Sequence, residues 1–313
     1  MPTRTETFAS PEAHVAANTN ADLHISLLLR KTRAPWMISS VDLPDLRAQW
    51  GLGGGCTVTE GTVSPGGRVL FMPTENVQAM HMNGRRFDAQ TFRLQRPGDE
   101  LSLSSNEPHG WFSMFIADRV FGEWSRSGAM PVPPSSCFLQ IPQQRAEAFR
   151  RTVVQLGSIV RGAPGAFDSP LAIATTSRRL TELAREVFGY LATPTTQTGR
   201  HILSREQIVS AVMDCIDRRD GEYLTVPDLA SAAGVSERTL RAAFQDYFGV
   251  GPVRFLRVRT LNLARLALKK SDPALTTVTE VATRLGVWEL GRFARDYRLL
   301  FGELPSATLY GAG

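Results

Sequence analysis

The sequence predicts an α+β chain of two domains: a β-barrel or jelly roll with two trailing helices, and an all-helical C-terminal domain. Its 313 residues suit about two domains, since a domain commonly has ~100–200 residues. Between residues 23 and 122, short apolar-alternating runs are separated by Gly- and Pro-rich turns, which is typical of barrels and jelly rolls. From residue 143 onward the apolar residues recur every three or four positions, as on one face of a helix.

The strand-like runs of the first half predict a cupin-like jelly roll over residues 21–140. They lie at 24–29, 56–63, 68–72, 86–94, 100–105 and 111–117. The stretch GLGGGC (51–56) lacks the Gly-x-Gly-x-x-Gly spacing of a dinucleotide-binding loop, and we interpret it as a turn. Residues 1–20 are small and polar, so we expect a disordered tail there.

Two amphipathic helices are predicted after the strands, over 143–161 and 170–191, and they complete a first domain at 21–192. Residues 193–203 (TPTTQTGRHIL) are interpreted as a linker, and 204–313 as the second domain. The expected apolar faces consist of Ala146, Phe149, Val153, Leu156 and Val160 in the first helix, and of Leu171, Ile173, Leu180, Leu183, Val187 and Leu191 in the second.

A helix-turn-helix is predicted over 224–249, LTVPDLASAAGVSERTLRAAFQDYFG. Gly234 suits the left-handed bend between two helices, and Ser236 suits the N-cap of the second one. Arginines three residues apart on an exposed helix face can enter the major groove, where the guanidinium forks onto guanine O6 and N7. The exposed face of this second helix carries Glu237, Arg238, Arg241 and Gln245.

The pattern recurs over 278–302, VTEVATRLGVWELGRFARDYRLLFG, where Glu289, Arg292 and Arg295 are expected to be exposed. Two such units in tandem are a stronger signal than one, because single amphipathic helix pairs are common. A helix over 251–270 joins them. Its arginines are available for phosphate contacts: Arg254, Arg257, Arg259 and Arg265.

The positive charge of the chain is concentrated in this tandem segment. The whole chain has a net charge of +5. From Val235 to the end there are 12 Lys and Arg against 7 Asp and Glu, so this segment alone carries the entire excess. Excess positive charge is what binding to a phosphate backbone requires.

Residues 204–309 resemble the C-terminal DNA-binding region of the AraC/XylS family of bacterial transcription regulators. The resemblance rests on LASAAGVSERTLRAAFQDYFGVGP, RVRTLNLARLAL and VTEVATRLGVWELGRFARDYRLLFGELPS. It implies two helix-turn-helix units that read successive major-groove segments of a promoter, with Ser236 among the contacts. It also implies activation through RNA polymerase, a sensor and dimerisation role for the first domain, and a homodimer.

The segment LLLRKTRAPW (27–36) sets Arg30, Lys31 and Arg33 close to Trp36. Three cations and a large ring suit an anionic ligand with a stackable base. Some regulators of the resembled family sense cyclic di-GMP, so we expect a small-molecule effector here, an anionic nucleotide such as cyclic di-GMP being the specific candidate. An exposed basic strand end, or an unrelated metabolite as effector, remains open.

Other function classes have weaker support. No Ser-His-Asp or paired-carboxylate arrangement can be assembled, and the spacing of the histidines and cysteines predicts no metal site, so we expect neither an enzyme nor a resident cofactor. A DNA-repair enzyme with the same helical domain would need a cysteine cluster beyond Cys56 and Cys137. An architectural DNA-binding protein remains an alternative. The N-terminus lacks a secretory signal and no apolar run is long enough for a membrane helix, so we expect a cytoplasmic protein.

Overall fold

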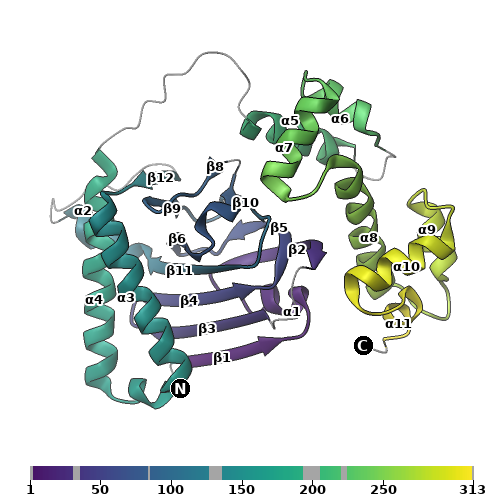
Figure 1. The fold of residues 1–313 in the computed structure, drawn as a ribbon. Coiled ribbons are helices and arrows are strands. Elements are labelled where there is room, and N and C mark those ends of the chain that lie inside the picture. The colour runs from purple at the N-terminus through teal and green to yellow at the C-terminus, as the bar shows by residue number, and fades with distance from the viewer. Residues whose placement is uncertain are drawn as a thin grey trace. The chain divides into compact units, whose positions relative to one another are not determined.

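The computed structural model describes residues 3–30, 36–83, 85–126, 136–192, 205–219 and 224–311. The chain divides into two compact units (Figure 1). The first comprises Met1–Ile25, Thr32–Gly54 and Thr59–His201, and the second comprises Ile202–Gly313 with the short segments Ser26–Lys31 and Gly55–Val58. A sheet-rich first unit and a helical second unit confirm the predicted α+β class. The predicted linker, 193–203, lies outside the described residues.

Two sheets form the framework of the first unit. One has the order β1-β3-β4-β11-β6-β9-β12 and the other the order β2-β5-β10-β7-β8. The strands are β1 (Thr3–Phe8), β2 (Ala21–Arg30), β3 (Trp36–Leu43), β4 (Leu46–Gly53), β5 (Gly55–Val63), β6 (Gly67–Glu75), β7 (Met80–Met82), β8 (Arg85–Arg86), β9 (Thr91–Gln95), β10 (Glu100–Ser105), β11 (His109–Ala117) and β12 (Cys137–Gln140). The single strand expected over 86–94 is thus divided between β8 and β9.

The seven-stranded sheet is buried on both faces. One face packs against the five-stranded sheet through a core that includes Phe71, Trp111 and Met82. The other face packs against helices α2 (Asp118–Arg126), α3 (Gln143–Gly162) and α4 (Pro170–Phe188), which Figure 1 shows side by side along this sheet. Both predicted amphipathic helices are therefore present, although Leu171, expected on the apolar face, is 76% exposed because it lies in the first turn of α4.

The predicted disordered tail is wrong. Residues Thr3–Phe8 form β1, which pairs antiparallel with β3, with Thr3 opposite Val41 and Phe8 opposite Trp36. The next segment forms helix α1 (Pro11–Ala16), which begins at Ser10, whose hydroxyl accepts from the Ala13 N–H at 3.2 Å. An edge strand gains its hydrogen bonds from a distant partner, and its own alternation of half-buried and exposed residues carries little apolar signal.

The prediction of a turn at GLGGGC is also wrong, because the glycines lie mostly within β4 and β5. At Gly51 and Gly53, aromatic rings occupy the space that a side chain would need. A Cβ on Gly51 would lie 2.1 Å from Trp111 Cε2, and a Cβ on Gly53 would lie 2.7 Å from His109 Cε1. These glycines allow rings from the neighbouring strand β11 to lie across β4.

In the part of the second unit between residues 202 and 313, all the described regular secondary structure is helical. Its helices are α5 (Arg205–Arg218), α6 (Val226–Ala232), α7 (Glu237–Phe248), α8 (Pro252–Lys270), α9 (Val278–Arg284), α10 (Leu290–Phe301) and α11 (Pro305–Leu309). Short 3-10 turns at Val77–Ala79, Pro164–Phe167 and Gly189–Ala192 belong to the first unit. Among the described helices of both units, none combines the length and the apolar character needed to cross a bilayer.

Candidate nucleic-acid interface

Each helix pair of the second unit begins at a threonine that caps its first helix. The Thr225 N–H donates to Asp228 Oδ2 at 2.8 Å, and the Thr277 N–H donates to Glu280 Oε2 at 2.8 Å. Each threonine hydroxyl accepts in return from the backbone of the same acidic residue, which completes a capping box. Hydrogen bonds from the Thr225 side chain and backbone lower the pKa of Asp228, and those from the Thr277 backbone and side chain lower the pKa of Glu280.

A left-handed glycine turns the chain between the two helices of each pair. Gly234 has a φ of 63° and Gly286 a φ of 73°, a region in which a Cβ is strained. After the first glycine, the Val235 N–H donates to Ala230 O at 3.0 Å, and the corresponding bond of the second turn has the same length. Both turns therefore have the geometry that the predicted helix-turn-helix needs.

The second turn is one residue longer than the first. Gly249 is the C-cap of α7 and Gly302 is the C-cap of α10, both with positive φ, but the second pair has one more residue between its turn glycine and its C-cap glycine. Trp288 lies in this longer turn and is 79% exposed. The sequence carries a signal for this shift, because the spacing from Gly286 to the buried Phe293 is one residue longer than the spacing from Gly234 to the buried Leu240.

With this shift, the buried faces of α7 and α10 correspond. Leu240 and Phe244 are fully buried in α7, and Phe293 and Tyr297 occupy the same positions of α10. The sequence predicts a buried face of Leu290, Phe293 and Tyr297 for α10; Phe293 and Tyr297 are buried, but Leu290 is 36% exposed at the first position of the helix. Because these aromatic side chains face inward, the opposite faces of the two helices remain for a ligand.

The predicted residues on the exposed face of α7 differ in the hydrogen bonds and ion pairs that they form. Among the described residues, none forms an ion pair or hydrogen bond with Arg238. Arg241 pairs with Glu237 at 2.8 Å, one helical turn away. Ser236 is the N-cap and accepts from Thr239 N at 3.2 Å, and the Gln245 amide donates back to Gly249 O at 3.1 Å. Arg238 is thus the most readily available guanidinium on this helix.

The arginines of α10 are placed differently from those of α7. Arg292 pairs with Glu289 at 3.3 Å and approaches Asp296 at 3.9 Å, whereas Arg295 is exposed and makes no such contact with the described residues. When the buried faces of α7 and α10 are superposed, Arg292 lies one residue after the position that corresponds to Arg238. Arg295 likewise lies one residue after the position that corresponds to Arg241. One residue rotates a side chain by about 100° around a helix axis, so the two units present different faces to a duplex.

The arginines predicted for phosphate contact lie on α8, between the two pairs. Arg254 is exposed and unpaired among the described residues, and Arg259 is half-buried. Arg257 Nη1 lies 3.7 Å from Asp296 Oδ2 and so links α8 to α10. Arg265 is not available for phosphate, because it is 9% exposed and pairs with Glu303 at 2.7 Å.

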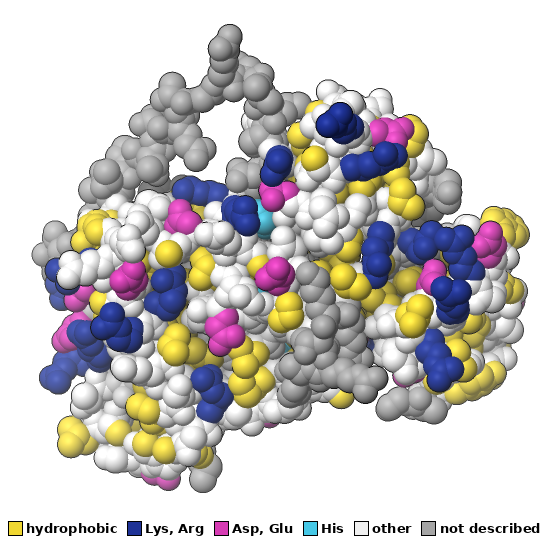
Figure 2. Space-filling view, in the orientation of Figure 1, with side chains coloured by type: hydrophobic (Ala, Val, Ile, Leu, Met, Phe, Trp, Pro, Cys, Tyr) yellow, Lys and Arg dark blue, Asp and Glu magenta, His cyan; other side chains and the backbone are white. Residues whose placement is uncertain are grey.

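Two grooves lie on either side of Arg257. One, of about 750 Å³, is lined by Arg241, Arg254 and Leu299, and the other, of about 530 Å³, by Arg259, Arg292 and Trp288 among others. Figure 2 shows Lys and Arg side chains distributed over these helices. Five of the predicted arginines therefore border concave surfaces that a phosphate backbone can approach: Arg241, Arg254, Arg257, Arg259 and Arg292.

The residues predicted to bind an effector are only partly described. Lys31, Arg33 and the side chain of Arg30 lie outside the described residues. Trp36 is 4% exposed, and its ring lies 5.3 Å from the His14 ring inside the first unit. A ligand on the outer surface therefore has no access to this ring.

Comparisons with known proteins match the second unit most strongly. A family model described as "Helix-turn-helix domain" matches residues 229–310. "XylDLEGF operon transcriptional activator 2" of Pseudomonas putida is 32% identical over 136 residues, which is 42% of this chain and 87% of that protein. "Probable thc operon regulatory protein" of Rhodococcus erythropolis is 34% identical over 157 residues, 49% of this chain. The matched part spans 47% of the Rhodococcus protein.

A solved structure also matches this unit. It is titled as a probable AraC family transcriptional regulator from Rhodopseudomonas palustris CGA009, and it is 40% identical. The match covers 34% of this chain and 96% of that structure, with a TM-score of 0.31.

Proposed function

The chain belongs to the AraC/XylS family of transcription regulators, and from this premise we propose that it binds promoter DNA sequence-specifically through its two helix-turn-helix units. The observation that carries the proposal is the repeated geometry: two capped helices, two left-handed glycine turns and two arginine-bearing second helices, joined by α8. Helices of this kind present their N-terminal residues to base edges in the major groove.

The contacts fall into two classes. Arg238 at the start of α7 suits bidentate readout of a guanine, a contact that discriminates against the wrong base by ~1–3 kcal/mol. Arg241 can also contact a base if its ion pair with Glu237 breaks. The free-energy cost of breaking it is small, because an exposed ion pair at this spacing contributes only ~0.3–0.5 kcal/mol. Arg254 and Arg259 suit phosphate oxygens, which fix the position on the duplex without reading sequence.

The second helix-turn-helix reads its segment of the promoter DNA through other residues. Glu289, Arg292 and Arg295 remain the proposed contacts, with Arg257 as a further phosphate contact once it leaves Asp296. The exposed Trp288 joins this set, because a large apolar side chain beside the groove can contact thymine methyl groups. The rotated arginine pair implies that the two half-sites differ in sequence.

Activation belongs to the same proposal. The Pseudomonas putida relative is named a transcriptional activator, which supports activation for this chain as well. We expect activation to proceed by contact with RNA polymerase. We include a homodimer and action in the cytoplasm as expectations for a regulator of this family.

Control by a small-molecule effector in the first unit completes the proposal. An effector changes DNA binding only if it binds the DNA-competent state more tightly than the other state. One candidate is an anionic nucleotide such as cyclic di-GMP at Arg30, Lys31 and Arg33, without the buried Trp36. Calorimetric titration of the full chain, with Arg33→Ala alongside, tests it; absence of heat would refute this candidate and leave an unrelated metabolite as the alternative.

The DNA proposal is tested by selecting bound sequences from random duplexes with the full chain. We expect an enriched site with two unequal half-sites, and loss of preference at one base pair in Arg238→Ala. Arg161→Ala, an exposed arginine of α3, is the matched control and should select the same site. Equal affinity for selected and scrambled duplexes would instead indicate an architectural DNA-binding protein.

A further inference from the structure

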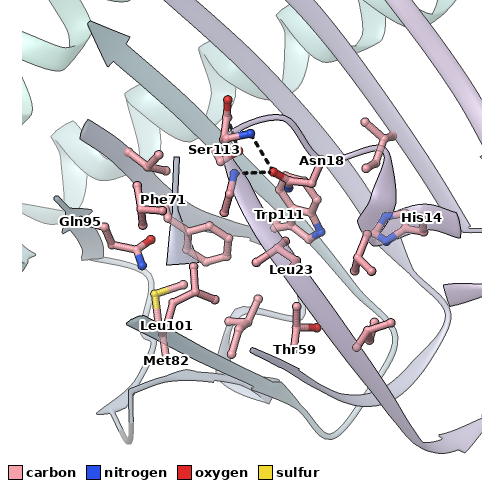
Figure 3. A pocket seen from close by; sticks show the side chains of 18 of the residues that line it. His14, Asn18, Leu23, Thr59, Phe71, Met82, Gln95, Leu101, Trp111 and Ser113 are labelled. Atoms are coloured by element: carbon pink, nitrogen blue, oxygen red, sulfur yellow. Dashed lines mark hydrogen bonds between the residues drawn. The ribbon is translucent and has the colours of Figure 1, made fainter. Parts of the chain in front are cut away.

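A small, largely apolar cavity of about 60 Å³ lies in the first unit. Its walls come from both sheets and from α1, and most of them are aliphatic or aromatic, including Leu23, Phe71, Leu101 and Trp111 (Figure 3). Among the described residues that line it, there is no Lys, Arg, Asp or Glu. The cavity is therefore suited to an uncharged occupant, because an isolated charge would lose its hydration without gaining a partner.

Two polar side chains on the wall have an atom without a partner. The Nδ1 of His14 and the Nε2 of Gln95 are buried and make no hydrogen bond with any described residue. The two side chains are 4% and 2% exposed. In Figure 3 they lie on opposite sides of the Phe71 and Trp111 rings. Buried polar atoms are normally paired, so two unpaired ones at one apolar cavity point to a missing partner.

Other polar groups on the same wall are already satisfied by the protein. The Asn20 amide donates to Ser113 Oγ at 2.8 Å and its oxygen accepts from Arg47 Nε at 2.8 Å. Asn18 Oδ1 accepts from the backbone N–H groups of Asn20 and Ala21. His14 and Gln95 are thus distinguished from neighbours whose polar atoms serve the fold.

The backbone determines which kind of hydrogen bond His14 offers. Its Nε2 lies 3.2 Å from Met37 O, and because a carbonyl only accepts, Nε2 carries the proton and Nδ1 is an acceptor. Burial, assisted by repulsion from His109, lowers the pKa of His14 to about 4, so the ring is neutral near pH 7. Burial likewise lowers the pKa of His109 to about 4. The Gln95 amide offers a donor at the other side.

We propose that this cavity binds a small uncharged molecule, apolar over most of its surface, that donates a hydrogen bond to His14 Nδ1 or accepts one from the Gln95 amide. Binding to this cavity does not depend on the proposed regulator function, but the role of the ligand as the effector rests on it. The space is smaller than the ~150 Å³ apolar cavity that holds benzene. A one-ring ligand therefore enters as flexible side chains shift, and Met82 on the wall is suited to this.

The proposal is tested with one-ring probes titrated calorimetrically into the full chain without DNA. The probes are benzene, phenol and benzenesulfonate, which share the ring and differ in hydrogen bonding and charge. We expect phenol to bind about fivefold more tightly than benzene, as one net hydrogen bond gives, and benzenesulfonate not to bind. Failure of all three to bind, or binding of benzenesulfonate as tight as that of phenol, would overturn the proposal.

Three variants in the cavity and one control outside it locate the site. Gln95→Leu and His14→Phe each remove one unpaired atom, and at least one of them should reduce the preference for phenol over benzene to about onefold. Gln140→Leu, on β12 and outside the cavity, should leave the preference unchanged. Leu23→Phe fills the space and should abolish binding of both uncharged probes, so the test stands even if His14→Phe does not fold. An unchanged preference in both polar variants would refute the assignment.

Two further experiments distinguish the cavity proposal from the cyclic di-GMP proposal and from the DNA proposal. Cyclic di-GMP is titrated into wild type and Leu23→Phe; binding equal in both would place the nucleotide elsewhere and leave the cavity to an uncharged ligand. Arg238→Ala should bind phenol like wild type, so failure of the cavity proposal and failure of the DNA proposal are recognised independently.

Discussion

Replacing Gln95 by leucine should stabilise the ligand-free protein. The Gln95 side chain is 2% exposed and its amide nitrogen has no described partner, so the folded state carries the cost of a buried unpaired group. That cost is ~1–3 kcal/mol, and leucine of similar size removes it. For a unit of this size, each kcal/mol raises Tm by ~2–4 °C. The variant should therefore melt at a higher temperature than the wild type.

Gln49 provides the matched control, because it is 1% exposed but has a partner. Its Oε1 accepts from the Thr19 N–H at 3.2 Å, so Gln49→Leu should destabilise by about the ~0.5–1.5 kcal/mol that one hydrogen bond contributes. Urea unfolding followed by tryptophan fluorescence measures both variants. Four of the five tryptophans report on the first unit: Trp36, Trp50, Trp111 and Trp124.

The reasoning would be refuted if Gln95→Leu destabilised the protein as much as Gln49→Leu does. Gln95 would then contribute to the fold through contacts of its own, and the argument for a ligand at its amide would lose its basis.

Three other predictions concern charge, packing and pH. Arg254→Ala should weaken binding to all duplexes equally and reduce the salt dependence of log K by about one unit, measured by fluorescence anisotropy over a salt series. Gly51→Ala should destabilise by at least ~1–3 kcal/mol in urea, because its Cβ would lie 2.1 Å from Trp111 Cε2. Between pH 7 and 4, stability should fall by up to about 3 kcal/mol for each of His14 and His109: their folded pKa is about 4, so only the unfolded state takes up protons as the pH falls below 6.5.

Each of these has a result that contradicts it. Sequence-dependent weakening in Arg254→Ala would make that arginine a base contact. Wild-type stability of Gly51→Ala would mean that the Trp111 ring moves aside freely. Stability that stays level or rises on acidification would show that the two histidines are protonated in the folded state.

Local signals were sufficient for the helical unit. Thr225 and Thr277 with their acidic partners, and the glycines Gly234 and Gly286, are short patterns that specify caps and turns within a few residues. These patterns did not reveal the one-residue shift before α10, because the shift appears only when the buried faces of the two helix pairs are superposed. That shift decides where the arginines of the second unit point.

The first unit shows the opposite case. Residues 1–20 have no apolar period, yet they supply β1 and the His14 ring of the cavity, since β1 pairs with β3, which is distant in the sequence: Phe8 lies opposite Trp36 and Thr3 opposite Val41. GLGGGC resembles a turn in isolation, but Gly51 and Gly53 lie in a strand under the rings of Trp111 and His109. No local pattern indicates that a ring from a distant strand will need that space.

The amino-acid sequence by itself determined the helical repeat, its basic character and the family, because helix caps, glycine turns and charge act over short distances along the chain. Tertiary structure alone decided which polar groups are left unpaired: His14 and Gln95 come together at one cavity through non-local strand pairing, and only the complete set of neighbours shows that neither finds a partner.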